Sequence, residues 1–259
     1  MTGRVVAIIP ARYSSTRLPG KALAAIGGKP MIQHVYERTA GAKLVHDVLV
    51  ATDDERIVAA VNRFGGHVAL TPSSLKSGTD RIAYAARPMT DAEIIVNVQG
   101  DEPLIVPEMI DQAVQPLVDD PGLPVGTLVR RIDSADDLTN PNIPKVVLDR
   151  NSDCLFFSRS AIPYGRDIPP SEWLRHHTYY KHIGLYVFRR DFLLRFAEMS
   201  QTPLELAEKL EQLRVLEHGF KMRGTVTSFE SVPVDTQADL DKVRALVSQI
   251  PSGGERASR

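Results

Sequence analysis

A cluster of three cations follows the first apolar run of the sequence. The run RVVAII is strand-like, and Arg12, Arg17 and Lys21 come after it in a loop rich in serine, threonine, proline and glycine. In open α/β sheets, ligands bind beyond the carboxyl ends of the strands, and the first strand–loop–helix turn is a favoured place for phosphate. Cations and backbone N–H groups on that turn suit an anion with several charges. A solvated surface loop is the alternative interpretation, and these residues alone leave both open.

Carboxylates follow two other strand-like runs. In VNVQGDEP, Asp101 and Glu102 come directly after the strand, and Gly100 lets the backbone turn. Asp235 ends a later strand-like stretch, just before the last expected helix. Such carboxylates could hold Mg²⁺, which takes few protein ligands plus phosphates. The structural alternatives are a turn-forming Asp-Glu pair and, for Asp235, a helix cap.

Polar residues in the second half of the chain form a third candidate group. FFSRSAIP places Arg159 at the end of a strand, the alternation in KHIGLYVF puts His182 and Tyr186 on one face, and LEQLRVL offers Glu211 and Gln212 on an expected helix. Together these side chains suggest a pocket for a polyhydroxylated acid. Each could also be structural, and their spacing does not decide between the two.

The elements that position these residues alternate between strand and helix over the first 120 positions, which predicts a doubly wound, mostly parallel α/β sheet. Strands are expected at 4–9, 47–54, 67–71 and 93–103, and helices at 28–42, 55–65, 77–86 and 107–120. We expect Asp53 and Asp54 to serve in capping the second helix, and Thr79 to be the N-cap of the third.

After residue 124 the pattern changes to a smaller, mixed β region. Strand-like segments at 125–132, 145–158 and 181–189 surround a proline-rich stretch, IPYGRDIPPSEWLRHH, that we expect to form a protruding arm. Helices are predicted at 203–219 and 237–250. The sequence thus predicts one domain over 1–250, with a subdomain near 125–190, and a disordered tail at 251–259.

The composition restricts the class of protein. With 31 Lys+Arg against 32 Asp+Glu, the formal net charge is −1, which does not favour a nucleic-acid coat or a membrane surface. The single cysteine, Cys154, rules out an intramolecular disulfide and fits a reducing cytosol, and we expect it to be a packed thiol. Pro10 interrupts the first apolar run too early for a signal segment or a membrane span. We therefore expect a cytoplasmic protein.

Common cofactor motifs are missing from the sequence. The P-loop pattern GxxxxGK[ST] is absent, as are GxGxxG after a strand, GxSxG and HExxH. A P-loop NTPase and a dinucleotide-binding dehydrogenase are therefore disfavoured.

Nine motifs, in order over roughly 4–247, resemble the 3-deoxy-manno-octulosonate (Kdo) cytidylyltransferase family. They are IIPARYSSTRLPGKAL, GKPMIQHV, SGTDR, VNVQGDEP, NPNIPKVV, FFSRSAIP, HIGLY, LEQLRVLEHG and VDTQADL. Related sialate cytidylyltransferases share the IPAR opening but continue it with a different loop, and sugar-1-phosphate nucleotidylyltransferases usually begin with a GTRL loop. The resemblance implies a nucleotide-diphospho-sugar-transferase-like sheet and a homodimer formed through the arm.

The resemblance also implies a reaction and a set of site residues. CTP and Kdo would give CMP-Kdo and pyrophosphate with Mg²⁺, for lipopolysaccharide biosynthesis, with the anomeric hydroxyl attacking the α-phosphorus. The implied nucleotide site comprises Pro10, Ala11, Arg12, Ser14, Ser15, Lys21, Ser77, Arg81 and Gln99. The implied sugar-acid site comprises Gln99, Arg159, His182, Tyr186, Glu211 and Gln212, with Arg159 or His182 facing the carboxylate. The implied magnesium ligands are Asp101 and Asp235, which together with Arg12 and Lys21 form the catalytic set.

Three positions depart from the family pattern. Pro233 and Gln237 stand where the family usually has Gly and Pro beside its second aspartate, and Tyr164 stands where Trp is common. None of these changes removes a charged group that the chemistry needs. Two alternatives are a cytidylyltransferase for a related sugar acid, such as 8-amino-Kdo or a sialic acid, and a non-catalytic nucleotide-binding protein.

Overall fold

A computed structural model describes residues 3–14, 18–230 and 232–249 of the chain. Its centre is a sheet with the strand order β11-β7-β10-β6-β1-β4-β5. All of these strands run in one direction except β10, which is antiparallel to both of its neighbours. The strands are β1 (Arg4–Ala11), β4 (Asp47–Thr52), β5 (His67–Leu70), β6 (Ala92–Asn97), β7 (Val125–Arg131), β10 (Tyr180–Arg189) and β11 (Met222–Val226).

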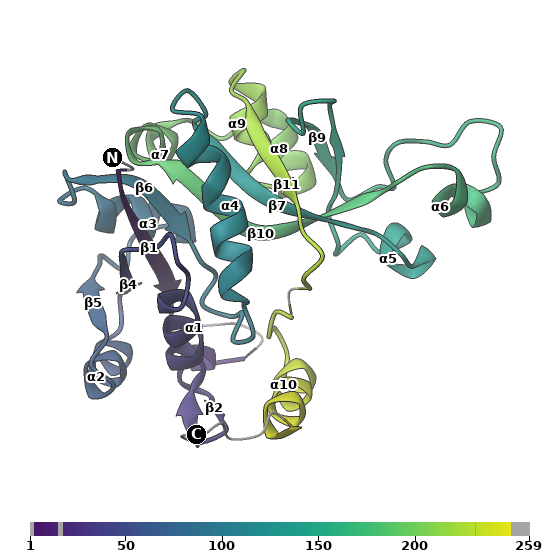
Figure 1. Cartoon of the computed structure of the whole chain (residues 1–259). Helices are drawn as coiled ribbons and strands as arrows, with labels where there is room; N and C mark the ends of the chain where they lie inside the picture. Colours follow the sequence, from purple (N-terminus) through teal and green to yellow (C-terminus); the bar gives the residue numbers. More distant parts are fainter. Residues whose placement is uncertain (1–2, 15–17, 231, 250–259) are drawn as a thin grey trace, which may run out of the picture.

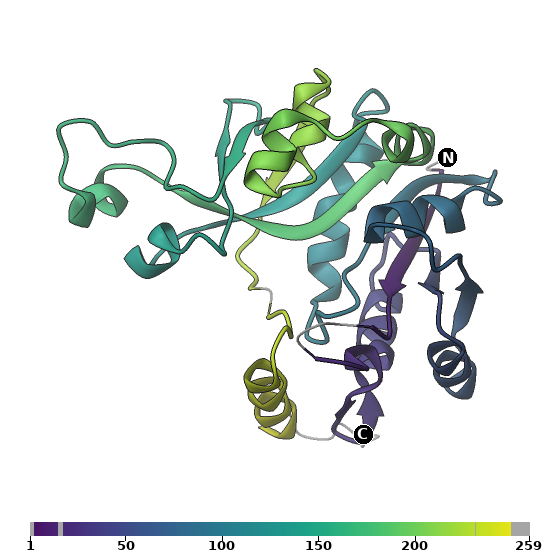
Figure 2. The same ribbon diagram turned by 180° about the vertical axis from the view of Figure 1, so that it is seen from behind.

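Helices cover both faces of this sheet, as Figures 1 and 2 show. Along β1, Val5, Ala7 and Ile9 belong to one apolar cluster, and Val6 and Ile8 belong to the other. This period of two is what a strand buried on both faces requires. The first cluster includes residues of α1 (Met31–Ala40), α2 (Glu55–Arg63) and α4 (Pro107–Asp119), and the second includes residues of α3 (Gly78–Ala86), α7 (Arg190–Glu198) and α9 (Leu213–Glu217). The predicted doubly wound α/β fold is confirmed.

The predicted strands differ from the observed ones mainly at their ends. β1 continues through Pro10 to Ala11 rather than stopping at residue 9. Proline has no N–H group to donate to a neighbouring strand. Pro10 is tolerated because β6 is paired with β1 only as far as Ile8, so at Pro10 the strand is paired on one side alone, with Ala51 of β4 as its register partner. The strand expected at 93–103 ends at Asn97, which leaves the following residues free to form the site loop.

Two expectations about helices were wrong. The N-cap of α3 is Ser77, not Thr79, because Ser77 and Asp80 form a reciprocal capping box. The helix expected over 203–219 is two short helices, α8 (Pro203–Glu208) and α9, separated by Lys209 in the left-handed region at φ 53°. Arg159 accounts for the break, because its guanidinium donates hydrogen bonds to the Glu208 and Lys209 carbonyls, at 2.6 and 3.3 Å.

The proline-rich segment extends away from the sheet, as Figures 1 and 2 show. Beside it are α5 (Ala135–Thr139) and the hairpin of β8 (Lys145–Leu148) and β9 (Cys154–Ser158), which joins the sheet through β10. The arm has its own small core around Trp173 and Tyr179, and Tyr164 lies against Trp173 while 77% exposed. The arm ends in η2 (Pro170–Glu172) and α6 (Trp173–His176).

The remaining elements are η1 (Lys21–Leu23), the short pair β2 (Ala25–Ile26) and β3 (Lys29–Pro30), and α10 (Gln237–Gln249). Cys154 is buried, as expected for a packed thiol, and burial raises its pKa to about 12. In the described part of the chain, no helix is both long and apolar enough to cross a membrane. The single-domain division stays a prediction, and the expected disordered tail lies outside the described residues.

Candidate active site

Three charged residues from distant parts of the chain meet at the carboxyl edge of the sheet. The Lys21 ammonium, at the start of η1, lies 2.7 Å from Asp101 Oδ2 and 3.2 Å from Asp235 Oδ1. Asp101 follows β6, and Asp235 lies between β11 and α10. Because six of the seven central strands point toward this edge, the loops that follow them are brought together there. The contact joins the cationic loop to both predicted metal carboxylates.

The backbone fixes the position of Asp235. Val234 N donates to Asp101 O at 2.8 Å, so the two aspartates are held on adjoining segments. The backbone N–H groups of Asp235 and Thr236 donate to Asp239, at 3.1 and 2.8 Å. The start of α10 is thus capped by Asp239 and Thr236, and the Asp235 carboxylate is directed to Lys21 instead.

Pro233 leaves this arrangement intact. The backbone hydrogen bond to Asp101 comes from the next residue, Val234, which has an N–H group to donate. The departure from the family pattern at this position therefore removes no donor from the contact between the two aspartate segments.

A cavity of about 220 Å³ lies next to Lys21. Gly100 forms part of its wall where the loop after β6 passes β1, and a Cβ atom there would lie 2.7 Å from Pro10 O. Only glycine permits this approach without a backbone shift. Most of the residues expected at the nucleotide line the cavity: Pro10, Ala11, Arg12, Ser14, Lys21 and Gln99. The predicted metal ligand Asp101 lines it too, with Ala22 and Gly100. Ser15 and Arg17 lie outside the described residues.

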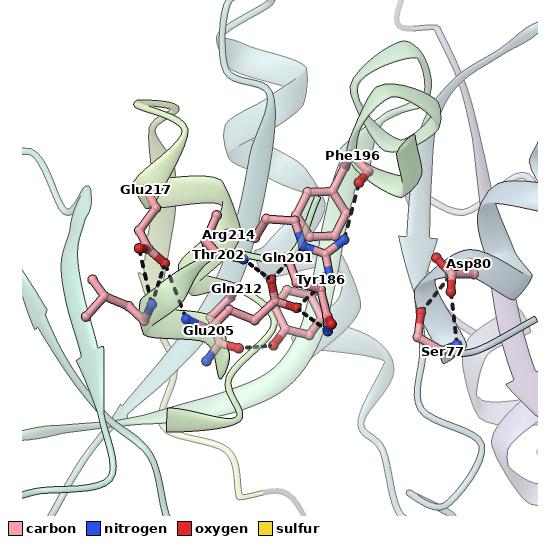
Figure 3. A network of polar contacts seen from close by, with 11 residues as sticks. Ser77, Asp80, Tyr186, Phe196, Gln201, Thr202, Glu205, Gln212, Arg214 and Glu217 are labelled. Carbon is pink, nitrogen blue, oxygen red and sulfur yellow. Dashed lines mark hydrogen bonds and ion pairs between the residues drawn. The ribbon is translucent and has the colours of Figure 1, made fainter. Parts of the chain in front are cut away.

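Two other residues expected at the nucleotide are engaged within the protein. Ser77 caps α3, with Asp80 N donating to its hydroxyl at 2.9 Å (Figure 3). Arg81 is fully buried and its guanidinium contacts Asp53, at 2.8 Å, and Thr71. Arg81 therefore ties α3 to the loops after β4 and β5. Of the two acids expected to cap α2, Asp54 does so, and Asp53 pairs with Arg81.

His182 is a neutral member of the sugar-acid group. Its Nε2 lies 2.9 Å from Thr127 Oγ1, and its ring packs near Phe157 and Tyr186. Burial lowers the pKa of His182 to about 3, so the ring is uncharged at neutral pH. It can exchange hydrogen bonds with a substrate hydroxyl, but it supplies no positive charge to a carboxylate.

Arg159 carries the positive charge of this group. Besides the Glu208 and Lys209 carbonyls, its guanidinium donates to Pro141 O at 2.8 Å. It therefore connects the base of the arm to the end of α8. Any contact between Arg159 and a sugar carboxylate would be made by a guanidinium that is already fixed in place.

Tyr186, Glu211 and Gln212 face one another in the interior. The Tyr186 hydroxyl donates to Gln212 Oε1 at 3.1 Å (Figure 3). Thr79 hydrogen-bonds to Glu211, and burial raises the pKa of both Glu211 and Tyr186. Among the described residues, the buried atoms Glu211 Oε1 and Gln212 Nε2 have no hydrogen-bond partner. They border a cavity of about 10 Å³, enough for one water.

Sequence reasoning missed two buried polar residues next to this group. Thr127 of β7 holds His182, and Lys145 of β8 is fully buried with Nζ 2.9 Å from Asn140 O. Burial, reinforced by the nearby charge of Arg159, lowers the pKa of Lys145. The signal for both was a polar side chain inside an otherwise apolar strand, in VGTLV and PKVV.

The cytidylyltransferase family model matches residues 6–223. The chain is 60% identical over 249 residues to 3-deoxy-manno-octulosonate cytidylyltransferase of Geobacter metallireducens, covering 93% of this chain and 96% of the relative. It is 54% identical to the enzyme of the same name from Pelobacter propionicus, with 96% and 99% covered.

The chain belongs to the 3-deoxy-manno-octulosonate cytidylyltransferase family.

Solved structures agree with this family assignment. A structure of CMP:2-keto-3-deoxy-manno-octonic acid synthetase complexed with CTP superposes with a TM-score of 0.89 at 45% identity, covering 95% of this chain and 99% of that one. The more distant 4-diphosphocytidyl-2C-methyl-D-erythritol synthase from Anaerococcus prevotii has a TM-score of 0.62 at 12% identity, which shows a shared fold alone. The family resemblance predicted from the sequence is confirmed.

Proposed function

We propose that this cytidylyltransferase transfers CMP from CTP to 3-deoxy-manno-octulosonate, releasing pyrophosphate and supplying CMP-Kdo for lipopolysaccharide biosynthesis. The observation that carries the proposal is the contact of Lys21 with Asp101 and Asp235 beside the 220 Å³ cavity. It occurs in a chain 60% identical to a relative that bears the name of this activity.

Charge compensation is the main task of the nucleotide side. CTP carries about four negative charges and the sugar acid one more, and a like-charge pair at about 4 Å costs roughly 4 kcal/mol at an effective dielectric of 20. Arg12 and Lys21 line the cavity and reduce this repulsion. We propose that Lys21 stabilises the charge that develops on the phosphates while the anomeric hydroxyl attacks the α-phosphorus and pyrophosphate leaves.

Asp101 and Asp235 fit a magnesium ion. Both direct an oxygen at the same cationic group, the Lys21 ammonium, so their carboxylates converge on a position that favours positive charge. Among the described residues, no three His, Cys, Asp or Glu side chains gather as a metal cluster, which leaves these two carboxylates with phosphate oxygens as the ligand set. When bound, Mg²⁺ supplies charge neutralisation of the triphosphate and favours ionisation of a coordinated hydroxyl.

Recognition of the sugar acid is assigned to the interior group. His182, Tyr186 and Gln212 offer uncharged hydrogen-bonding groups for sugar hydroxyls, since burial keeps the first two neutral. Arg159 is the cation of the group and is proposed to face the carboxylate. Gln99 lies between the two sides, because it lines the nucleotide cavity and its Cγ lies 3.9 Å from where a Cβ on Gly184 of β10 would be.

We further propose that the enzyme acts in the cytoplasm as a homodimer. CTP is a cytoplasmic nucleotide, and the arm, which extends away from the sheet in Figure 1, carries the exposed Tyr164. Sedimentation equilibrium of the wild type against Tyr164→Ser tests the second part. We expect the wild type to be a dimer and the variant dimer to have a higher dissociation constant. A monomeric wild type would contradict the proposed homodimer.

Pyrophosphate release tests the activity. Purified protein with CTP and Mg²⁺ is assayed separately with Kdo, 8-amino-Kdo and N-acetylneuraminate, and we expect release with Kdo to exceed the other two. Preference for another acid would retain the mechanism and change the substrate. Release with none of them, combined with CTP binding, would support a non-catalytic nucleotide-binding protein instead.

The Asp235→Asn variant tests the assignment of two metal carboxylates. It should fold as the wild type does, because α10 is capped by Asp239 and Thr236, and it should lose Mg²⁺-dependent turnover. Wild-type turnover in this variant would contradict the assignment.

A further inference from the structure

Two residues proposed to bind the sugar acid lie in a connection that is not helical. Glu211 and Gln212 belong to residues 209–212, between the end of α8 and the start of α9. A loop position orients a side chain less accurately than a regular helix does, so the sugar-binding geometry depends on what holds the connection. The neighbouring contacts identify these constraints.

A buried ion pair closes the connection. The Arg214 guanidinium, in α9, donates to Glu205 of α8 through two N–H groups, with Nε–Oε2 at 2.8 Å and Nη2–Oε1 at 2.5 Å (Figure 3). Both side chains are less than 10% exposed. The guanidinium also donates to Phe196 O at 3.4 Å and lies 4.6 Å from the centre of the Phe196 ring. A two-pronged pair of this kind fixes both the distance and the orientation of the two helices.

The same pair is linked to the backbone on either side. Glu205 accepts a hydrogen bond from Thr202 N at 3.2 Å at the start of α8. Leu210 N donates to Glu205 O, and Arg214 N donates to Glu211 O, at 3.3 and 3.1 Å. Hydrogen bonds from Arg214 keep the pKa of Glu205 low despite burial, so the pair is charged.

We propose that Glu205 and Arg214 are positioning residues for the sugar acid: their ion pair holds α8 and α9 together so that the Glu211 carboxyl and the Gln212 amide are presented to the substrate. The inference rests on the proposed function. It explains why two buried polar atoms that have no hydrogen-bond partner among the described residues, Glu211 Oε1 and Gln212 Nε2, are found beside a buried ion pair. Such a pair contributes little net stability compared with apolar packing, so a geometric role accounts for its presence better than a stabilising one.

The test is a set of variants in the full-length enzyme. Arg214→Met leaves Glu205 buried and unpaired, and its stability should fall. The double variant Glu205→Gln/Arg214→Met buries no unpaired charge, keeps an acceptor for Thr202 N, and should recover much of the thermal stability. In both, we expect the KM for Kdo to rise about tenfold, from the loss of about one hydrogen bond to the sugar. The KM for CTP should stay within about twofold of the wild-type value, the spread expected when no CTP contact is lost.

Arg195→Met is the matched control. Arg195 is an exposed arginine 4.8 Å from the centre of the Phe220 ring, so its replacement also removes a stacked guanidinium but leaves the Glu205–Arg214 pair in place. Its kinetic constants should match the wild type. Arg214→Lys retains the charge without the two-pronged geometry, and its KM for Kdo should lie between those of the wild type and Arg214→Met.

Hydrogen–deuterium exchange gives a readout that does not depend on turnover. Peptides covering 209–213 should exchange faster in the double variant than in the wild type or in Arg195→Met. Unchanged exchange there, or a KM for Kdo that returns to the wild-type value in the stable double variant, would overturn the inference. Failure of the wild type to use Kdo would instead count against the proposed function, and exchange would still decide the positioning role.

Discussion

The two sides of the proposed site differ in charge and in exposure. On the nucleotide side, Lys21, Asp101 and Asp235 are charged and partly exposed, at 15%, 30% and 39% of their side-chain surfaces. Lys21 begins η1, and the two aspartates lie on loops. On the sugar-acid side, His182 and Tyr186 are neutral, enclosed and held by protein hydrogen bonds. A triphosphate requires charges that stay solvated until it binds, whereas hydroxyl groups are distinguished by fixed donors and acceptors.

The largest expected effect is on the charged side. Replacing Lys21 by Met removes the cation that contacts both aspartates, and we expect kcat to fall by about 10²–10³ because a positive group aimed at the developing phosphate charge is lost. Steady-state pyrophosphate release measures it. Lys29→Met is the control, since Lys29 is an exposed lysine paired with Glu37, and it should keep wild-type rates. A Lys21→Met enzyme with normal kcat would show that the Lys21 charge does not contribute to the reaction.

The second effect concerns the backbone that supports each side. Gly100→Ala places a methyl group 2.7 Å from Pro10 O, and we expect the free energy of unfolding to fall by about 2–3 kcal/mol. Gly184→Ala, whose new Cβ would have Gln99 Cγ as its nearest neighbour at 3.9 Å, should cost less than about 1 kcal/mol. Urea denaturation of both variants measures the difference. Equal losses would show that the loop at Gly100 and strand β10 at Gly184 tolerate a methyl group equally well.

The third effect is the pH dependence of stability that the uncharged His182 on the sugar-acid side contributes. The pKa of His182 is about 3 in the folded protein and about 6.5 when unfolded, so only the unfolded chain gains a proton as the pH falls below 6.5. Stability should therefore fall with decreasing pH, by about 2 kcal/mol at pH 5 relative to neutral pH. His182→Gln should lack this component, whereas His176→Gln, an exposed arm histidine, should retain it. An identical pH profile for His182→Gln and the wild type would mean that burial does not lower the pKa of His182.

The smallest expected effect is a change in the KM for one of the two substrates and not for the other. Tyr186→Phe removes the hydroxyl that donates to Gln212, and we expect the KM for Kdo to rise about five- to tenfold while the KM for CTP is unchanged. Tyr180→Phe, on the same strand, is the control. A parallel rise in both KM values would show that the two sides are not independent.

The same contrast decided what the sequence could predict. The doubly wound sheet followed from apolar runs with clear boundaries, and Lys21, Asp101 and Asp235 could be anticipated because each follows a strand-like run at one edge. The neutral state of His182 could not be predicted, since it depends on burial, in which Phe157 of β9 takes part along with Tyr186 of the same strand. The site assignments themselves stay predictions.

The helix expected at 203–219 was wrong for a related reason. The periodicity of this segment is helical throughout. Arg159, about fifty residues earlier in the chain, donates hydrogen bonds to the carbonyls of Glu208 and Lys209 and so interrupts the helix. Local helix propensity does not include a hydrogen-bond donor that the tertiary fold brings to the helix from a distant part of the chain. The same kind of long-range contact made Arg81 a partner of Asp53.

The Lys21 bridge has a consequence for how the substrate enters. One ammonium offsets one of the two negative charges of Asp101 and Asp235, so under the proposed function Lys21 would exchange its carboxylate partners for phosphate oxygens while the two aspartates would hold the metal. Before binding, the ammonium reduces the repulsion between the two carboxylates, and because all three groups are partly exposed, affinity for the nucleotide should fall as the ionic strength rises.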